Sequence, residues 1–167
     1  MTKKRKEERC VGSMCPVDSG GKSCDCKEEK SEMEMRKLKI YIDSGAADTV
    51  CPKDFHPGGE VRETAESKKG KYYLAANNSK IPVHGRKTIQ GVTDDWNNLK
   101  IEAEVADVRR ALGSVKRLCE AGNTVVFSGK ESYIQNDRTG NKTKIEQSGK
   151  GYVVNVWVPH FQGQANP

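Results

Sequence analysis

The triplet Asp-Ser-Gly occurs twice in this chain, beginning at Asp18 and at Asp43. A carboxylate that activates water must be held rigidly, with hydrogen bonds on one side and exposure on the other. The second triplet can meet these needs, because an apolar strand-like segment precedes Asp43 and Gly45 permits a tight turn whose N–H approaches the carboxylate. The segment before Asp18 is too short for a strand and contains Pro16, so we interpret the first triplet as a turn in a tail.

The residues around the second triplet leave space for a substrate. The Ser44 hydroxyl can brace the loop, and the small side chains of Ala46 and Ala47 leave room for a substrate. His56, His84 and His160 are scattered, and no Cys or Ser stands in a recognisable nucleophile setting. The sequence therefore favours carboxylate chemistry at Asp43 over a covalent nucleophile.

The stretch from Ile42 to Val50, Ile-Asp-Ser-Gly-Ala-Ala-Asp-Thr-Val, resembles the catalytic loop of the retropepsin-like aspartic protease family, as found in retrotransposon polyproteins. The stretch Ala111-Leu112-Gly113 resembles the family's apolar pair followed by glycine and a short helix. The segment after residue 122 resembles, more loosely, segments that follow the protease in such polyproteins.

This resemblance implies a retropepsin-like closed β barrel and an aspartic endopeptidase that cuts extended peptide or polyprotein. It implies that Asp43 is the catalytic carboxylate and that Ser44 and Gly45 complete the loop that supports it. The residues that it implies for substrate binding are Ala46, Ala47 and Asp48 in the loop, and Asn77, Asn78 and Gly85 in a flap hairpin. It implies neither a metal nor another cofactor.

Aspartic proteolysis uses two carboxylates that share one proton, because two like charges about 3 Å apart cannot both ionise. Asp18 lies only 25 residues before Asp43 (43 − 18) and is too close to head a lobe of its own. We therefore expect the second carboxylate to be Asp43 of another copy, which predicts a homodimer with the site on its two-fold axis.

Two alternatives to an active protease remain open. The resembled family often carries Asp where Ala47 stands and Arg or Asp where Ser114 stands, so the chain could be a catalytically inactive binding or scaffolding module. The basic run from Lys3 to Lys6 could make a weak nucleic-acid contact. Four cysteines in the same tail have spacings that fit free thiols better than a zinc site: Cys10, Cys15, Cys24 and Cys26.

The elements that must position Asp43 are mostly strands. Leu38, Ile40 and Ile42 alternate with polar residues, which predicts a half-buried strand that ends at Asp43. Similar patterns predict strands at residues 71–75, 81–83, 99–108, 124–127, 132–135, 143–146 and 152–158. Residues 114–121 predict the one short helix, with Ser114 as N-cap and Gly122 as the stop. Cys51, Cys119, Trp96 and Trp157 are expected to be packed side chains.

The 167 residues fit one mainly β body with tails. We expect a disordered charged tail at 1–34, a protease domain at 35–122, a C-terminal β extension of hairpins at 123–158 and a second tail at 159–167. No apolar run approaches the roughly 20 residues of a membrane span, and no signal peptide follows Met1. We therefore expect no membrane contact, an intracellular location in cytoplasm or nucleus, and six reduced cysteines.

Overall fold

The computed structural model describes residues 33–56 and 58–160. Strand pairing begins at Glu34 and ends at His160, so it extends slightly into the predicted tails. Residues 1–32 and 161–167 of those tails lie outside the described residues, and with them Asp18, the basic run at residues 3–6 and the four cysteines considered for zinc.

The described chain is mainly β, which confirms the predicted class. Its first half contains β1 (Glu34–Asp43), β2 (Val50–Cys51), α1 (Ala65–Lys68), β3 (Tyr72–Leu74), β4 (Lys80–Thr93) and β5 (Asn98–Ala106). Its second half contains β6 (Ala111–Ser114), α2 (Val115–Glu120), β7 (Asn123–Val126), β8 (Ser132–Asn136), β9 (Lys142–Ser148) and β10 (Gly151–His160). The expected helix is α2, and α1 is a second helix that the sequence did not predict.

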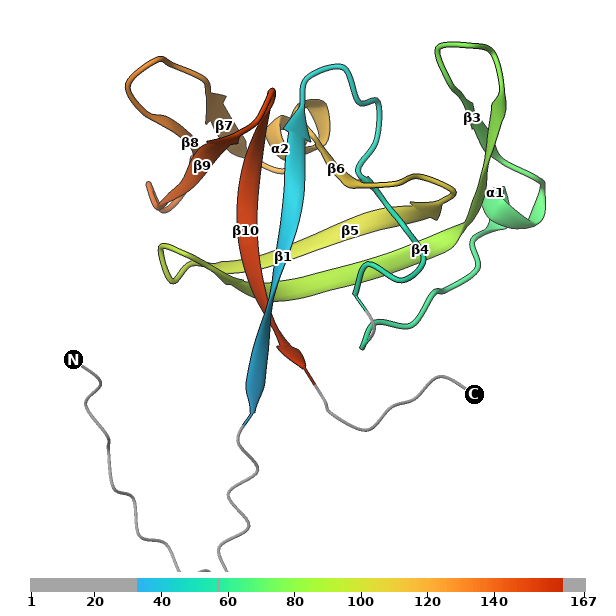
Figure 1. Ribbon diagram of the computed structural model, residues 1–167, viewed down its shortest axis with the longest axis horizontal. Coiled ribbons are helices and arrows are strands. Elements are labelled where there is room, and N and C mark those ends of the chain that lie inside the picture. The colour runs from blue at the N-terminus through green and yellow to red at the C-terminus, as the bar shows by residue number, and fades with distance from the viewer. Residues whose placement is uncertain (1–32, 57, 161–167) are drawn as a thin grey trace, which may run out of the picture. The chain divides into compact units, whose positions relative to one another are not determined.

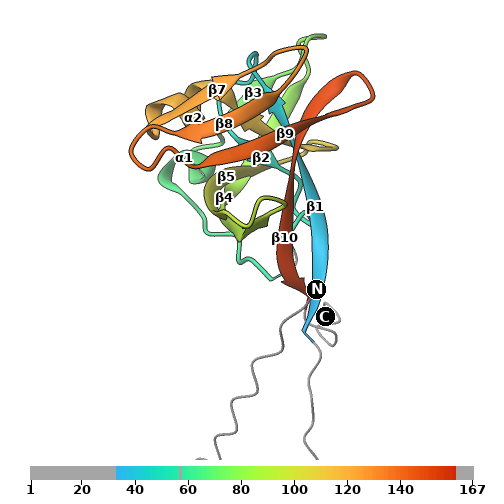
Figure 2. The same ribbon diagram turned by 90° about the vertical axis from the view of Figure 1, so that its left-hand side faces the viewer.

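The strands form one sheet in the order β3-β4-β5-β2-β6-β1-β10-β9-β8-β7, and β4 also pairs with β10. β1 and β10 run antiparallel side by side and cross the β4–β5 hairpin (Figure 1). Figure 2 shows the meander β7–β8–β9 leading into β10, with α2 next to β7. The predicted segments 35–122 and 123–158 are therefore joined by strand pairing between β1 and β10.

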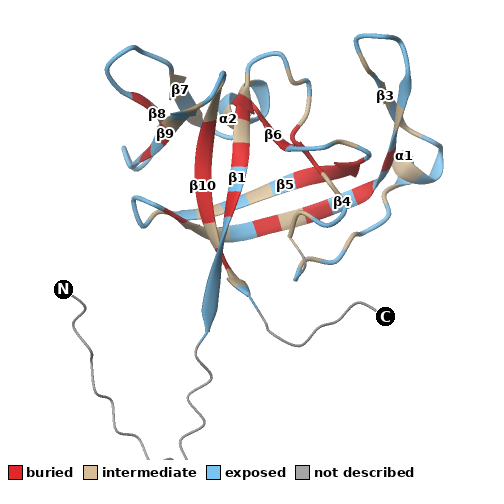
Figure 3. Cartoon of the chain, viewed as in Figure 1, coloured by how far each residue is buried: buried red, intermediate tan, exposed pale blue. Residues whose placement is uncertain are grey.

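The core follows from the alternation in β1 and from the valines of β10. Leu38 and Ile40 are buried and lie opposite Val156 and Val154 in the antiparallel register. Burying an aliphatic side chain of this size contributes about 1.5–3 kcal/mol. Figure 3 shows the buried residues concentrated where β1, β10, β4, β5 and β6 meet, whereas the hairpin tips are exposed. This core fixes β1, and with it the strand end that carries Asp43.

The crossing of β4 and β10 needs a residue without a side chain at Gly91. A Cβ atom there would lie 2.4 Å from the backbone oxygen of Trp157. Real Cβ contacts are never this close, so glycine is what lets the two strands approach. The sequence pattern did not predict this part of β4.

Two of the four side chains expected to be packed lie on the surface instead. Trp96 is 86% exposed, because it occupies a tight turn between β4 and β5 with φ of 62°. Cys119 is exposed, because it follows Leu118 by one residue and therefore points about 100° away around the helix. Cys51 is buried as expected, and Trp157 is partly buried, with its indole N–H donating to Asp94. In the part of the chain that the structure describes, no helix is long and apolar enough to cross a membrane.

Candidate active site

Asp43 is the last residue of β1 and lies beside the end of β6. The two strands are parallel, with Asp43 opposite Ser114. The other edge of β6 pairs with β2 through Leu112 and Val50. Because β6 lies between β1 and β2, the loop that joins these two strands, residues 44–49, must pass over the end of β6. This topology brings the loop to Ser114.

Hydrogen bonds from Gly45 and Ser114 help to hold the loop in place. The Gly45 N–H donates to Oδ1 of Asp43 at 2.8 Å. The buried Ser114 hydroxyl donates to the Ala46 carbonyl at 2.7 Å, and the Ser114 N–H donates to Oγ1 of Thr49 at 3.1 Å. Both ends of the loop are therefore attached to the fold, and the Asp43 carboxylate is fixed on one oxygen.

The Asp43 carboxylate is partly buried, and no cation of the described residues pairs with it. Gly45 is its hydrogen-bond partner, and no Lys, Arg or His forms an ion pair with it within the described ranges. Ser44, Gly45 and Ala47 are exposed next to it. A carboxylate supported on one oxygen and free on the other has the arrangement that a general base or acid needs.

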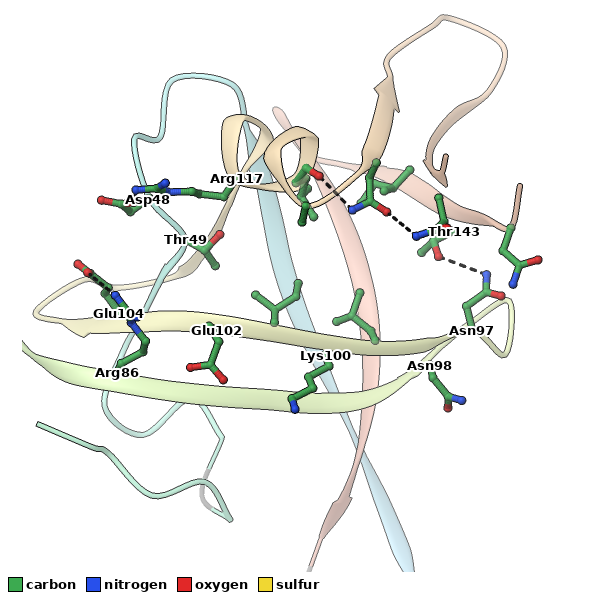
Figure 4. A pocket seen from close by; sticks show the side chains of 18 of the residues that line it. Asp48, Thr49, Arg86, Asn97, Asn98, Lys100, Glu102, Glu104, Arg117 and Thr143 are labelled. Carbon is green, nitrogen blue, oxygen red and sulfur yellow. Dashed lines mark hydrogen bonds and ion pairs between the residues drawn. The ribbon is translucent and has the colours of Figure 1, made fainter. Parts of the chain in front are cut away.

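Asp48, which the resemblance places among the substrate contacts, is held in a network of charged residues (Figure 4). Its Oδ1 accepts from Nε of Arg117 at 2.6 Å, and its Oδ2 accepts from the hydroxyl of Tyr73 at 2.8 Å. Burial raises the pKa of Asp48, but hydrogen bonds from Arg117 and Tyr73 outweigh it, so the pKa lies below the usual 3.8. The side chain stays ionised and ties the loop to α2 and β3.

Tyr73 connects the same loop to β5. Its hydroxyl lies 2.8 Å from Asp48 and 2.5 Å from Oε2 of the buried Glu104, whose Oε1 accepts from Lys71 at 2.8 Å. Burial and the two carboxylates raise the pKa of Tyr73, so the hydroxyl keeps its proton at neutral pH. No local pattern predicts this role of Tyr73, because the residues of the network come from three separate segments.

The β3–β4 hairpin occupies the place of the predicted flap. Its bend is at Asn77 and Asn78, where Asn78 has φ of 62° and the Ala75 N–H donates to the Ser79 carbonyl. Gly85 lies further along, at an irregular position of β4 against the backbone of Arg62. The structure thus joins the base of this hairpin to the loop through Tyr73 and Asp48, whereas no hydrogen bond among the described residues joins Asn77, Asn78 or Gly85 to the loop.

Replacing Asp48 by Asn tests whether this network stabilises the fold through charge. A carboxylate with a lowered folded pKa stabilises above about pH 3.8, and this contribution disappears as the pH falls through the folded pKa. Because Arg117 is half exposed, we expect Asp48→Asn to cost about 1 kcal/mol at pH 7. Urea unfolding across a pH series should show the gap between wild type and variant shrinking toward pH 2. A gap that stays constant with pH would contradict the charge-based role.

The other chemically interesting cluster surrounds Lys87, which is 2% exposed. Its Nζ donates to the carbonyls of Lys53 and His56 at 2.9 and 3.0 Å. Burial raises the pKa of the nearby Cys51 thiol to about 11. Cys51 is therefore a neutral thiol at physiological pH, and this cluster holds the loop after β2 rather than a nucleophile.

Within residues 33–56 and 58–160, no group of three or more His, Cys, Asp or Glu side chains is arranged to hold a metal ion. Comparison of the chain with protein-family models, curated proteins and solved structures gives no match.

Proposed function

We propose that the chain is an aspartic endopeptidase in which Asp43 and the Asp43 of a second copy form the catalytic pair. The observation that carries this proposal is the environment of Asp43, which ends a half-buried strand, accepts from the Gly45 N–H and has no cation partner among the described residues. The β1–loop–β6 arrangement also supports a retropepsin-like fold.

The chemistry follows from two carboxylates that share one proton. The ionised carboxylate takes a proton from the attacking water, while the protonated one gives its proton to the carbonyl oxygen of the peptide bond. The tetrahedral intermediate then collapses, the C–N bond breaks, and the amine leaves with a proton. No covalent intermediate with the protein forms. Because the pair must hold one proton, hydrolysis is expected to be fastest in the acidic range.

The second carboxylate must come from another copy, because the nearest acidic side chain along the loop, Asp48, already bonds to other side chains. Asp48 is ion-paired with Arg117 and bonded to Tyr73. A two-fold axis beside the β1 strand end would bring two Asp43 side chains together, since an isologous contact repeats the same residue from both copies.

Dilution tests this requirement. Hydrolysis of a denatured protein substrate at pH 5 is expected to fall more steeply than the chain concentration, because dimers dissociate on dilution. Sedimentation at the same concentrations measures the dimer fraction. Activity strictly proportional to concentration in a sample that sediments as monomer would refute the shared site.

A binding or scaffolding module without turnover is the second candidate. The tip of the β3–β4 hairpin favours this candidate. Among the described residues, Asn77 and Asn78 at the tip make no hydrogen bond to the loop after Asp43. Absence of hydrolysis, with no effect of a pepstatin-like inhibitor on thermal stability, would support this candidate.

A further inference from the structure

A groove of about 1170 Å³ lies outside the immediate surroundings of Asp43. One wall is β5, and the opposite wall is formed by α2 and the β7–β8–β9 meander (Figure 4). Its apolar lining comes from Leu99 and Ile101 of β5, Leu118 of α2 and Ile134 of β8. At one end the groove reaches Asp48, in the loop that carries Asp43.

The β5 wall is an open strand edge. β5 pairs with β4 from Asn98 to Ala106 but with β2 only at Glu104 and Val105. In the part of the chain that the structure describes, residues 98–103 therefore have no strand on their second side. An unpaired edge inside a groove is a template for another extended chain.

The hydrogen-bond pattern between β4 and β5 shows which N–H and C=O groups of β5 do not bond to β4. The Glu104 N–H donates to the Thr49 carbonyl, away from β4, and its β4 neighbour Arg86 bonds to Arg62 on the opposite side. Glu104 and Arg86 are thus opposite each other without hydrogen bonds between them. In an antiparallel pair of strands every second residue is of this kind, so Glu102 and Lys100 are as well. The N–H and C=O groups of Lys100 and Glu102 consequently point outward at this edge.

The charges along the groove select the side chains that fit. Two carboxylates of the lining are already paired, Asp48 with Arg117 and Glu104 with Lys71. Glu66, at the same end as Asp48, has no ion-pair partner among the described residues, so the acidic residues of an occupant fit only the other end. Two lining cations, Lys100 and Arg138, have no ion-pair partner among the described residues. An occupant with apolar residues at alternate positions and acidic residues between them would complement both features.

We propose that this groove binds an extended segment of the polypeptide substrate, away from the bond that is cut, by adding it as a strand to the β5 edge. The inference rests on the proposed endopeptidase function, whose substrate is an extended chain that can continue from the Asp43 loop past Asp48. The chain's own tails fit poorly, because residues 1–32 and 161–167 contain no alternating run of apolar residues.

Binding is best measured in the Asp43→Asn variant, so that hydrolysis does not consume the probe. The probe is a fluorescein-labelled eight-residue peptide that alternates valine with threonine or glutamate, followed by fluorescence polarisation. We expect saturable binding that weakens at least about tenfold in Lys100→Pro, because proline removes an outward N–H that β4 does not use. Lys100→Ala is the matched control, which removes the charge but keeps the N–H and should weaken binding only about twofold to threefold.

Other outcomes overturn the proposal. No saturable binding up to about 1 mM, or equal affinity for a probe N-methylated at alternate residues, would exclude strand addition. If Lys100→Pro dissociates a dimer, the groove holds a second copy of the chain. If deletion of residues 1–32 raises the affinity for the probe, the groove holds that tail. Thermal unfolding of Lys100→Pro verifies that the variant folds. Failure of the proposed function would appear instead as equal hydrolysis, or none, by the wild type and Asp43→Asn.

Discussion

Replacing Asp43 by Asn is expected to lower kcat for peptide hydrolysis by about 10³-fold while the fold survives. The amide cannot take a proton from water, and general acid–base catalysis of this kind contributes about 10²–10⁴-fold. The fold should tolerate the change, because the amide oxygen can still accept from the Gly45 N–H and Asp43 makes no ion pair within the described ranges. Cleavage of a fluorogenic peptide at pH 5 measures the loss, and thermal unfolding verifies the fold.

The chain offers a matched control in Asp18, which heads the other Asp-Ser-Gly triplet. Asp18→Asn should hydrolyse the peptide at the wild-type rate. Mixing equal amounts of wild type and Asp43→Asn tests the shared site further. If both copies must contribute, random pairing leaves about one quarter of the dimers active, whereas a self-sufficient monomer would leave about half. Full activity of Asp43→Asn would remove the protease proposal.

Local patterns predicted the strands whose stability comes from their own alternation. β1 buries every second residue of its second half, and β10 buries a run that includes three valines. The end of β1 and both ends of β10 were predicted to within two residues, whereas β1 begins a few residues before its alternating part. β2 was not predicted, because two residues are too few to show an alternating pattern and become a strand only by pairing with β5 and β6. β4 was not predicted beyond residue 83, because it contains Gly85 and Gly91, which break strands locally but are needed here where other backbone passes close.

The candidate site divides in the same way. The sequence predicted the turn that supports Asp43, because the Gly45 N–H that bonds to the carboxylate is within two residues of it. The network around Asp48 could not be predicted, because Tyr73 and Arg117 lie 25 and 69 residues away and meet Asp48 only through the sheet topology. α1 was not predicted for a different reason. It buries no residue and therefore shows no apolar periodicity in the sequence.

Ser114 connects the end of β6 to the loop that follows Asp43. Its side chain is fully buried, donates to the Ala46 carbonyl and accepts from the Arg117 N–H as the N-cap of α2. Ser114→Ala therefore removes a cap, worth about 1 kcal/mol, and leaves a loop carbonyl without its donor, at about 1–2 kcal/mol. We expect a loss of about 2–3 kcal/mol in the free energy of unfolding, measured by urea denaturation.

The same substitution should also lower kcat, because the loop that orients Asp43 loses one of its attachments to β6. Ser132→Ala is the matched control, since Ser132 is another buried serine whose hydroxyl bonds to the backbone of Ser128 in a different hairpin. It should lose stability with kcat unchanged. If Ser114→Ala also kept its kcat under conditions in which both variants are fully folded, the bond to Ala46 would serve only folding. A kcat defect confined to Ser114→Ala would instead show that the parallel pairing of β1 and β6 orients the carboxylate.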